Sequence, residues 1–431
     1  MKKIWKRCDR RSRLEGRVNL KASIVIPSYQ AKERLRLNLI ALNRQTYGGE
    51  DVEVIIVDNG STDGTFEMAE AFPLKYPKKV LRVARNRGIA FGRNTGIRAA
   101  SGDLLIFHDS DMIAGDSFLS QHLAAHEERD LVVCGLSWKR IYTFYYRDFA
   151  PDQLEALHRA YRRREDAPDW AALRDRQQLI PDQAVRDGRW AENAFDLDVD
   201  FVKGLKQILR EHGPELTDYS LAWRFFITNN LSVARSKVLE VGLLDESIRR
   251  YGFEDYDLGI RLYKAGCRVR IRQDIVSAHQ EHPVNFSYLD MVSNMNYICE
   301  KYNSIYFIDM VLVCGGDMML LSDRQLNAIN QEVNQTLALK GFEEFLSVYL
   351  ALLQLKRRQV LDPPSDNTAE LYAAVASKIP ALIRDLAVLQ RQYGMTELPR
   401  HLCHLAKCLL NIDLEAILLA NGAARNNSGE A

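Results

Sequence analysis

Short apolar segments alternate with helical patterns along the N-terminal part of the chain. The apolar segments, each followed by polar residues, are residues 22–27, 52–57, 80–84 and 103–107. Between them, apolar residues recur at helical intervals in 35–42, 66–72 and 92–100. Buried strands that alternate with helices form parallel sheets, in which ligands bind beyond the carboxyl ends of the strands. The pattern therefore predicts an α/β fold with a site where these polar clusters meet.

The pattern changes further along the chain. In residues 150–218, acidic and basic residues are interleaved, as on solvated helix faces, and Asp196, Asp198 and Asp200 alternate with apolar residues as in an edge strand. Another strand is expected at 268–271, and apolar residues at helical spacing follow at 308–321, 336–355, 371–390 and 402–420. We therefore expect a tail at 1–20, an α/β domain at 21–290 with an insertion at 150–218, a helical region at 291–420 and a disordered tail at 421–431.

Composition narrows the classes of protein. Lys and Arg total 58 and Asp and Glu total 57, so the formal net charge is +1 and a dedicated nucleic-acid-binding protein is disfavoured. The 7 cysteines include no CxxC pair, which favours a reduced, cytoplasmic setting over a secreted one. No apolar run is long enough to span a membrane, and none follows the basic residues of 1–20 as in a signal peptide. We interpret that basic stretch as a solvated tail, with peripheral contact to an anionic membrane surface as the alternative.

The strongest local feature is the sequence Asp109-Ser110-Asp111, which comes directly after an expected strand. In extended backbone, residues i and i+2 point to one side, so the two carboxylates are expected to converge. Two carboxylates on a divalent cation would hold a diphosphate, because the cation bridges to phosphate oxygens. A turn without a ligand is the alternative.

The order of several motifs carries more information than any one of them. Pro27-Ser-Tyr29 precedes Asp58-Asn-Gly-Ser-Thr-Asp63, Asn86-Arg-Gly88, Gly92-Arg-Asn-Thr-Gly96 and the Asp-Ser-Asp sequence. This succession resembles the N-terminal half of the family 2 glycosyltransferases, which have the GT-A fold. The resemblance implies that Asp58 accepts hydrogen bonds from the base of a nucleotide sugar and that Asp109 and Asp111 hold a metal ion. It also implies a nucleotide-sugar site lined by Pro27, Tyr29, Asp58, Asp63, Gly88, Arg93, Asp109 and Ser110.

A second group of motifs lies near the end of the α/β domain. Thr228-Asn229-Asn230, Gly252-Phe253-Glu254-Asp255 and Ala278-His279-Gln-Glu are similar to the acceptor-side half of bacterial chondroitin polymerases, β-1,4-galactosyltransferases and polypeptide N-acetylgalactosaminyltransferases. The similarity implies that Asp255 is a general base, that Glu254 positions the acceptor and that His279 is the third metal ligand. The implied acceptor contacts are Asn229, Asn230, Gly252 and Phe253. Simple helix capping is the alternative for the acid pair, and His282 is interpreted as a bystander or an acceptor contact.

We therefore expect a metal-dependent, inverting glycosyltransferase that uses a nucleotide sugar, with a UDP-sugar favoured, and Mn²⁺ or Mg²⁺ as cofactor. The expected acceptor is a glycan, a lipid-linked molecule or a small molecule. One alternative is a peptide acceptor held by the 150–218 insertion and the C-terminal helices. Another is an inactive scaffold that binds nucleotide sugars. The C-terminal helices are also a candidate surface for homo-oligomers.

Overall fold

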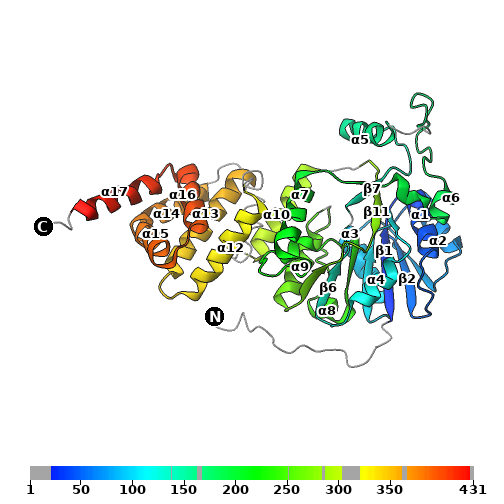
Figure 1. The fold of residues 1–431 in the computed structure, drawn as a ribbon, viewed down its shortest axis with the longest axis horizontal. Coiled ribbons are helices and arrows are strands. Elements are labelled where there is room, and N and C mark those ends of the chain that lie inside the picture. Colours follow the sequence, from blue (N-terminus) through cyan, green and yellow to red (C-terminus); the bar gives the residue numbers. More distant parts are fainter. Residues whose placement is uncertain are drawn as a thin grey trace. The chain divides into compact units, whose positions relative to one another are not determined.

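The computed structural model describes residues 21–427, except residues 137, 163–166, 251, 284–286, 303–320 and 362–365 (Figure 1). The chain divides into two compact units. Unit 1 comprises Met1–Thr217 and Ala222–Ser287, and unit 2 comprises Asp218–Leu221 and Tyr288–Ala431. No helix among the described residues is long and apolar enough to cross a membrane.

A mostly parallel sheet forms the centre of unit 1. Its strand order is β10-β6-β9-β4-β1-β2-β3, and only β9 runs antiparallel to its neighbours β4 and β6. The strands are β1 (Ala22–Ser28), β2 (Val52–Asp58), β3 (Lys78–Arg82), β4 (Leu104–His108), β6 (Leu131–Cys134), β9 (Asn230–Ala234) and β10 (Arg268–Ile271). The predicted strands are thus present, although β3 begins and ends two residues earlier than its apolar pattern suggested.

Helices flank this sheet, as the alternating pattern predicted (Figure 1). Those of the core are α1 (Lys32–Asn43), α2 (Thr65–Ala71), α3 (Ile89–Ala99), α4 (Phe118–Ala125), α8 (Arg235–Glu240) and α9 (Glu254–Lys264), with the short helix η2 (Ala222–Phe225). Helix α3 lies very close to β1, because a Cβ atom at Gly96 would be 2.5 Å from Cγ1 of Val25. The expectation of an α/β fold with a mostly parallel sheet is confirmed.

A second, smaller sheet adjoins the core in the order β5-β11-β7-β8. It consists of β5 (Met112–Ala114), β11 (Ser277–Gln280), β7 (Lys139–Ile141) and β8 (Phe195–Asp196). Strands β5 and β11 are antiparallel, and His279 pairs with Met112. This register brings the segment after β4 beside the histidine-containing strand, although the two are far apart in the sequence.

The 150–218 insertion folds with α5 (Pro151–Tyr161), α6 (Asp182–Arg186), η1 (Arg189–Asn193) and α7 (Asp200–His212). Tyr161, Ile180 and Trp190 of the insertion are buried in a hydrophobic cluster that they share with Leu37 and Ile40 of α1. The expected edge strand at 196–200 is wrong beyond Asp196. Asp200 instead begins α7, because Val202, Leu205 and Ile208 recur at helical spacing and become buried.

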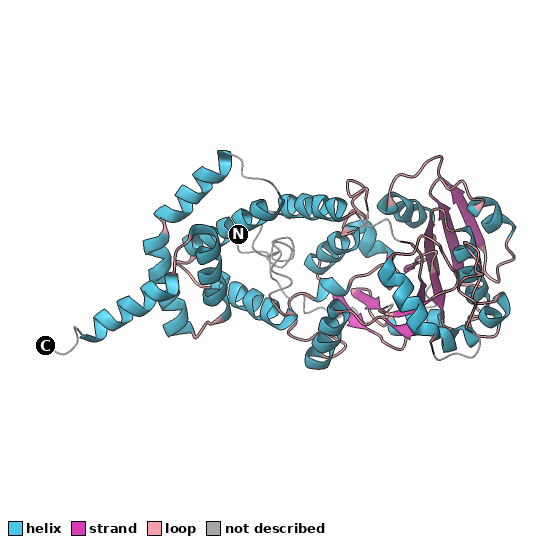
Figure 2. Cartoon of the chain, turned by 90° about the horizontal axis from the view of Figure 1, so that it is seen from above, coloured by secondary structure: helices cyan, strands magenta, loops and turns pink. Residues whose placement is uncertain are grey.

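Unit 2 contains only helices among its described residues (Figure 2). They are α10 (Tyr288–Tyr302), α12 (Asp323–Ala338), α13 (Glu343–Leu361), α14 (Asp366–Ser377), α15 (Ile379–Tyr393), α16 (Glu397–Leu410) and α17 (Leu414–Asn427). The helical pattern is confirmed, but the predicted ranges 336–355, 371–390 and 402–420 each span a break between two helices. Helix α17 also extends into the stretch expected to be a disordered tail, and the range 308–321 lies largely outside the described residues.

Candidate active site

Arg93 joins the two groups of acidic residues that the motifs identified. Its guanidinium Nη2 donates hydrogen bonds to Asp109 Oδ1 at 2.9 Å and Oδ2 at 3.1 Å. Nη1 donates to Glu254 Oε1 at 2.8 Å and to Asp255 Oδ1 at 3.3 Å. The Arg93 side chain is only 2% exposed, so one buried cation lies between three carboxylates. We call these four residues the Arg93 cluster.

The local fold fixes the position of Arg93. Helix α3 is held close to β1 at Gly96 and is bound to a distant loop through Asn94, whose side chain exchanges two hydrogen bonds with the backbone of Leu244. Both terminal nitrogens of Arg93 are bound to carboxylates, and its expected role in framing the nucleotide stays a prediction. Arg93 is a buried connector between the segment after β4 and the start of α9.

The two acids at the start of α9 differ in their surroundings. Glu254 is buried, its Oε2 has no hydrogen-bond partner, and burial together with neighbouring Asp255 raises its pKa to about 7. Asp255 is more exposed, and it accepts hydrogen bonds from the Thr228 hydroxyl at 2.8 Å and from the Thr228 backbone N–H at 3.1 Å. Of the two carboxylates, Asp255 is therefore the better placed to meet a substrate.

Asp111 belongs to a second cluster with His279 and His282, which we call the Asp111 cluster. One potential ligand atom from each residue lies within 4.8 Å of the others. Asp111 Oδ2 is 3.1 Å from Nε2 of His282 and 3.6 Å from Nε2 of His279. Burial acts to raise the pKa of Asp111, but the two imidazoles and Arg34 together hold it well below its usual range. The carboxylate therefore remains ionised and can bind a cation.

The second nitrogens of both imidazoles have partners of their own. Nδ1 of His279 lies 3.2 Å from Glu281 Oε1, and Nδ1 of His282 lies 2.9 Å from the Pro283 carbonyl oxygen. When Nδ1 carries the proton in these hydrogen bonds, the lone pair of Nε2 is free to bind a metal ion. The residues therefore fit a divalent cation held by one carboxylate oxygen and two imidazole nitrogens.

The expected metal set was Asp109, Asp111 and His279, and the structure groups Asp111 and His279 with His282. The backbone N–H of Met112 donates to the Asp109 carbonyl at 3.1 Å, so residues 109–112 form a turn instead of extended backbone. The two carboxylates therefore do not converge: Asp109 pairs with Arg93 and Asp111 faces the imidazoles. His282, expected to be a bystander, belongs to the cluster, and its spacing of three residues from His279 was the signal that sequence reasoning missed.

The residues expected to contact the nucleotide lie at the carboxyl ends of β1 and β2. Asp58 is buried at the end of β2, where its Oδ1 accepts a hydrogen bond from the Ser61 N–H at 3.1 Å and its Oδ2 has no partner. Pro27 is buried at the end of β1, and Tyr29 is 46% exposed beyond it. Ser110 is buried, and Gly88 (φ 91°) approaches Arg249 so closely that a Cβ atom would lie 2.5 Å from its carbonyl oxygen.

Asp63 has a local structural role. It accepts hydrogen bonds from the Lys32 N–H at 3.1 Å and from the Thr65 N–H at 3.1 Å. These contacts lie at the starts of α1 and α2, where free N–H groups need acceptors. Asp63 therefore supports the starts of both helices, and its expected contact with the nucleotide stays a prediction.

The expected acceptor residues divide into two groups. Asn230 is 1% exposed, and its side chain bonds to His122, to Ser277 and to the backbone of Ile275. The side chain of Asn230 is therefore engaged inside the protein, and its expected acceptor contact stays a prediction. Asn229 keeps a buried Oδ1 without a partner, and Gly252 (φ 105°) and Phe253 (φ 71°) form the left-handed turn that leads into α9.

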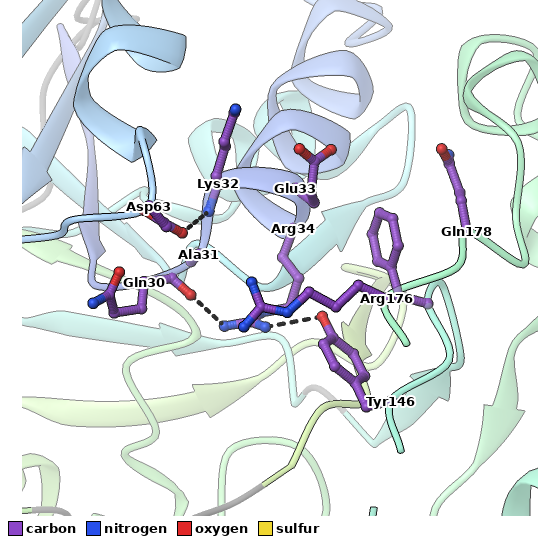
Figure 3. A pocket seen from close by; sticks show the side chains of 10 residues that line it. Gln30, Ala31, Lys32, Glu33, Arg34, Asp63, Tyr146, Arg176 and Gln178 are labelled. Atoms are coloured by element: carbon purple, nitrogen blue, oxygen red, sulfur yellow. Dashed lines mark hydrogen bonds between the residues drawn. The ribbon is translucent and has the colours of Figure 1, made fainter. Parts of the chain in front are cut away.

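A pocket of about 470 Å³ opens at the start of α1 (Figure 3). It is lined by Gln30, Ala31, Lys32, Glu33, Arg34, Asp63, Phe144, Tyr146, Arg176 and Gln178. Of the residues that the motifs singled out, it contains only Asp63. The pocket therefore lies outside the two acid clusters.

Comparison with known proteins identifies the chain. The model described as Glycosyl transferase family 2 matches residues 23–175. The "Uncharacterized glycosyltransferase YfnE" of Bacillus subtilis (strain 168) is 41% identical over 400 residues, which cover 92% of this chain and 99% of that relative. The "Validoxylamine A glucosyltransferase" of Streptomyces hygroscopicus subsp. limoneus is 29% identical over 300 residues, or 66% of this chain and 57% of that relative.

Among solved structures, the "Crystal structure of S. aureus TarS" matches with a TM-score of 0.46 and 16% identity, over 80% of this chain and 54% of that one. The family match and the 41% identical relative show that the chain is a glycosyltransferase. It belongs to glycosyl transferase family 2, and the expected GT-A fold class is confirmed.

Proposed function

We propose that this chain transfers a sugar from a nucleoside diphosphate sugar to an acceptor hydroxyl, with inversion at the anomeric carbon. The observation that supports this best is that two carboxylates only two residues apart, Asp109 and Asp111, belong to two different clusters. Asp109 is joined through Arg93 to the carboxylates at the start of α9, and Asp111 lies beside the two histidines. A site for the leaving diphosphate and a site for proton transfer would then be held two residues apart.

The nucleotide would lie at the carboxyl ends of β1 and β2. Asp58 Oδ2, buried without a partner, can accept a hydrogen bond from a ring N–H of the base, which both uracil and guanine offer. Tyr29 would cover the base and Pro27 would form the floor. A UDP-sugar remains the first donor to test, with GDP-sugars beside it.

Asp111, His279 and His282 would hold a divalent cation, which would neutralise the charge of the departing nucleoside diphosphate. Two imidazole nitrogens and one carboxylate oxygen suit Mn²⁺ better than Mg²⁺, because Mg²⁺ prefers oxygen ligands. Asp255 would accept the proton of the acceptor hydroxyl. The acceptor oxygen would bond to the anomeric carbon as the bond between that carbon and the diphosphate breaks. Glu254 would hold the acid cluster in place, and protonation near pH 7 would limit the negative charge beside Asp255.

Two substitutions separate the proposed roles. Asp111→Asn should weaken Mn²⁺-dependent UDP or GDP binding by about 10- to 100-fold or more, because it removes a direct ligand of the cation. Asp255→Asn should keep nucleotide binding but lower the rate of transfer by about 10²- to 10⁴-fold. Calorimetry with UDP and GDP, followed by hydrolysis of a nucleotide-sugar panel, would measure both effects.

Asp148→Asn is the control, since Asp148 is an exposed acid away from both clusters. Absence of both nucleotide binding and sugar hydrolysis in the unmodified protein would overturn the proposal. Unchanged Mn²⁺-dependent affinity in Asp111→Asn would show that the cation binds elsewhere. Equal loss of binding and transfer in Asp255→Asn would remove Asp255 from the role of base.

A further inference from the structure

The pocket at the start of α1 contains two arginines, and among the described residues neither forms a short ion pair with a carboxylate. Arg34 Nη1 donates to the Tyr146 hydroxyl at 3.1 Å and Nη2 donates to the Gln30 carbonyl at 3.3 Å, both neutral acceptors. Its Nε is buried and has no hydrogen-bond partner. Among the described residues, no carboxylate forms an ion pair with Arg34.

Arg176 reaches the same pocket from the 150–218 insertion. Its side chain is 72% exposed, and its ion pair is a long one of 3.9 Å with the adjacent Asp175. Figure 3 shows that the side chains of Arg34 and Arg176 both point into the space above Tyr146. Two guanidinium groups in one pocket repel each other unless an anion lies between them.

The two acids of the pocket do not supply that anion. Asp63 is bound to backbone N–H groups of Lys32 and Thr65, and Glu33 pairs with Arg36 at 3.0 Å. The first turn of α1 also faces the pocket, and its N–H groups carry partial positive charge. The free charge of the pocket is therefore positive, although the chain as a whole is nearly neutral.

The pocket is connected to the candidate active site through α1. The Asn38 side chain donates to the Asp109 carbonyl at 2.8 Å, and the Gln280 side chain donates to the Arg34 carbonyl at 2.9 Å. A ligand in the pocket would thus lie beside the Asp111 cluster without occupying the base site at Asp58.

We propose that this pocket binds an anionic group, a phosphate or a carboxylate, carried by the acceptor. Guanidinium groups bind both through charge-assisted, bidentate hydrogen bonds. A volume of about 470 Å³ is within the range of ligand pockets and exceeds what a single anion needs, so part of the attached sugar or polyol would enter as well. The proposal rests on the glycosyl-transfer function above and narrows the acceptor to negatively charged molecules.

The test uses the full chain saturated with UDP and Mn²⁺, so that the nucleotide site is filled. Calorimetry would compare glycerol 3-phosphate with glycerol, and glucuronate with glucose. We expect the charged member of at least one pair to bind at least about tenfold more tightly. Arg34→Gln and Arg176→Gln should each remove most of this difference, whereas Arg174→Gln, an exposed arginine in the same loop outside the pocket, should leave it unchanged.

Several outcomes would overturn the proposal. Charged and neutral probes could bind alike, or the two pocket variants could match the control. If UDP or GDP abolishes probe binding, the anionic group belongs to the nucleotide and not to the acceptor. Because UDP binding is measured separately in each variant, failure of the glycosyl-transfer function, seen as no nucleotide binding at all, is distinguishable from failure of the pocket. Tyr146→Phe removes only a neutral acceptor of Arg34. This variant should still bind the charged probe, which would show that a change in the pocket lining does not by itself abolish binding.

Discussion

Two buried polar clusters are contacted by residues close together at the start of β9, and they differ in charge. Thr228 binds Asp255 of the Arg93 cluster, whereas Asn230 binds His122. His122 also lies 2.8 Å from the Ser232 hydroxyl, which is 2.7 Å from His126. We call His122, His126, Asn230 and Ser232 the His122 network.

The difference lies in charge and in open hydrogen-bonding capacity. The Arg93 cluster has three carboxylates for one guanidinium, an unpartnered oxygen on Glu254 and a partly exposed Asp255. In the His122 network burial keeps the imidazoles neutral, and the side chains bind one another. Burial of a polar residue therefore does not by itself identify a functional site.

The largest expected effect comes from Arg93→Met. This change leaves three carboxylates around an apolar side chain, and removal of one partner of a buried ion pair costs about 3–5 kcal/mol. We expect sugar transfer to be lost, as measured with the nucleotide-sugar panel. We also expect unit 1 to be destabilised, as measured by urea unfolding. Arg98→Met is the matched control, because Arg98 lies on the same helix with its side chain 53% exposed. Near-normal stability and transfer in Arg93→Met would contradict the central role of this arginine.

The next effect is a pH dependence of stability from buried histidines. Burial lowers the pKa of His122 to about 3 and those of His126 and nearby His108 to about 4. The unfolded chain takes up protons near pH 6.5, so these groups stabilise the fold above that pH. Their contribution is lost as the pH falls toward 4, at up to about 1.4 kcal/mol per pH unit for each histidine.

Two acids act in the opposite direction. Burial raises the pKa values of Glu254 to about 7 and Asp109 to about 6, so protonation at these sites favours the folded state as the pH falls. The comparison of the unmodified protein with His126→Gln isolates one histidine. The difference in unfolding free energy between the two proteins should decrease as the pH falls from 6.5 to 4. Tryptophan fluorescence would monitor the unfolding of unit 1, because every tryptophan of the chain belongs to that unit. A pH-independent difference would show that His126 is not neutral in the fold.

The smallest effect is expected for Asn230→Ala. It leaves His122 and the Ile275 carbonyl without their amide partner, at a cost of about 1–3 kcal/mol. Transfer per folded molecule should stay unchanged, because the side chain is 1% exposed and its amide is bound to other residues of the protein. Loss of transfer with intact stability would instead return Asn230 to the acceptor site.

The same contrast explains what could be predicted from the sequence. The strands β1, β2 and β4 could be predicted because uninterrupted burial leaves an uninterrupted apolar run. Asp255 and His279 could be proposed as site residues because their motifs are local. The roles of Arg93 and His282 depend on contacts between distant segments. The turn at residues 109–112 also separates two carboxylates that the extended-strand rule would have joined.

Helix boundaries in unit 2 show another limit. Apolar spacing continues across the joins between helices, so 336–355 was taken as continuous. The chain instead leaves α12 at Ala338 and turns through Gly341, which has φ 90°. Asn411, in a left-handed conformation with φ 57°, ends α16 in the same way. The periodicity of apolar residues indicates which face of a helix is buried, but it does not reveal the single residues at which a helix ends.

The contact between Gly135 and Asn230 has a consequence for the divergence of this sequence. A Cβ atom at position 135 would lie 2.3 Å from the Asn230 Oδ1, so no side chain fits there while the amide is present. Position 230 can therefore change while Gly135 stays, but position 135 cannot change while Asn230 stays. In any descendant sequence, a shorter residue at 230 would have to arise before glycine at 135 could be replaced.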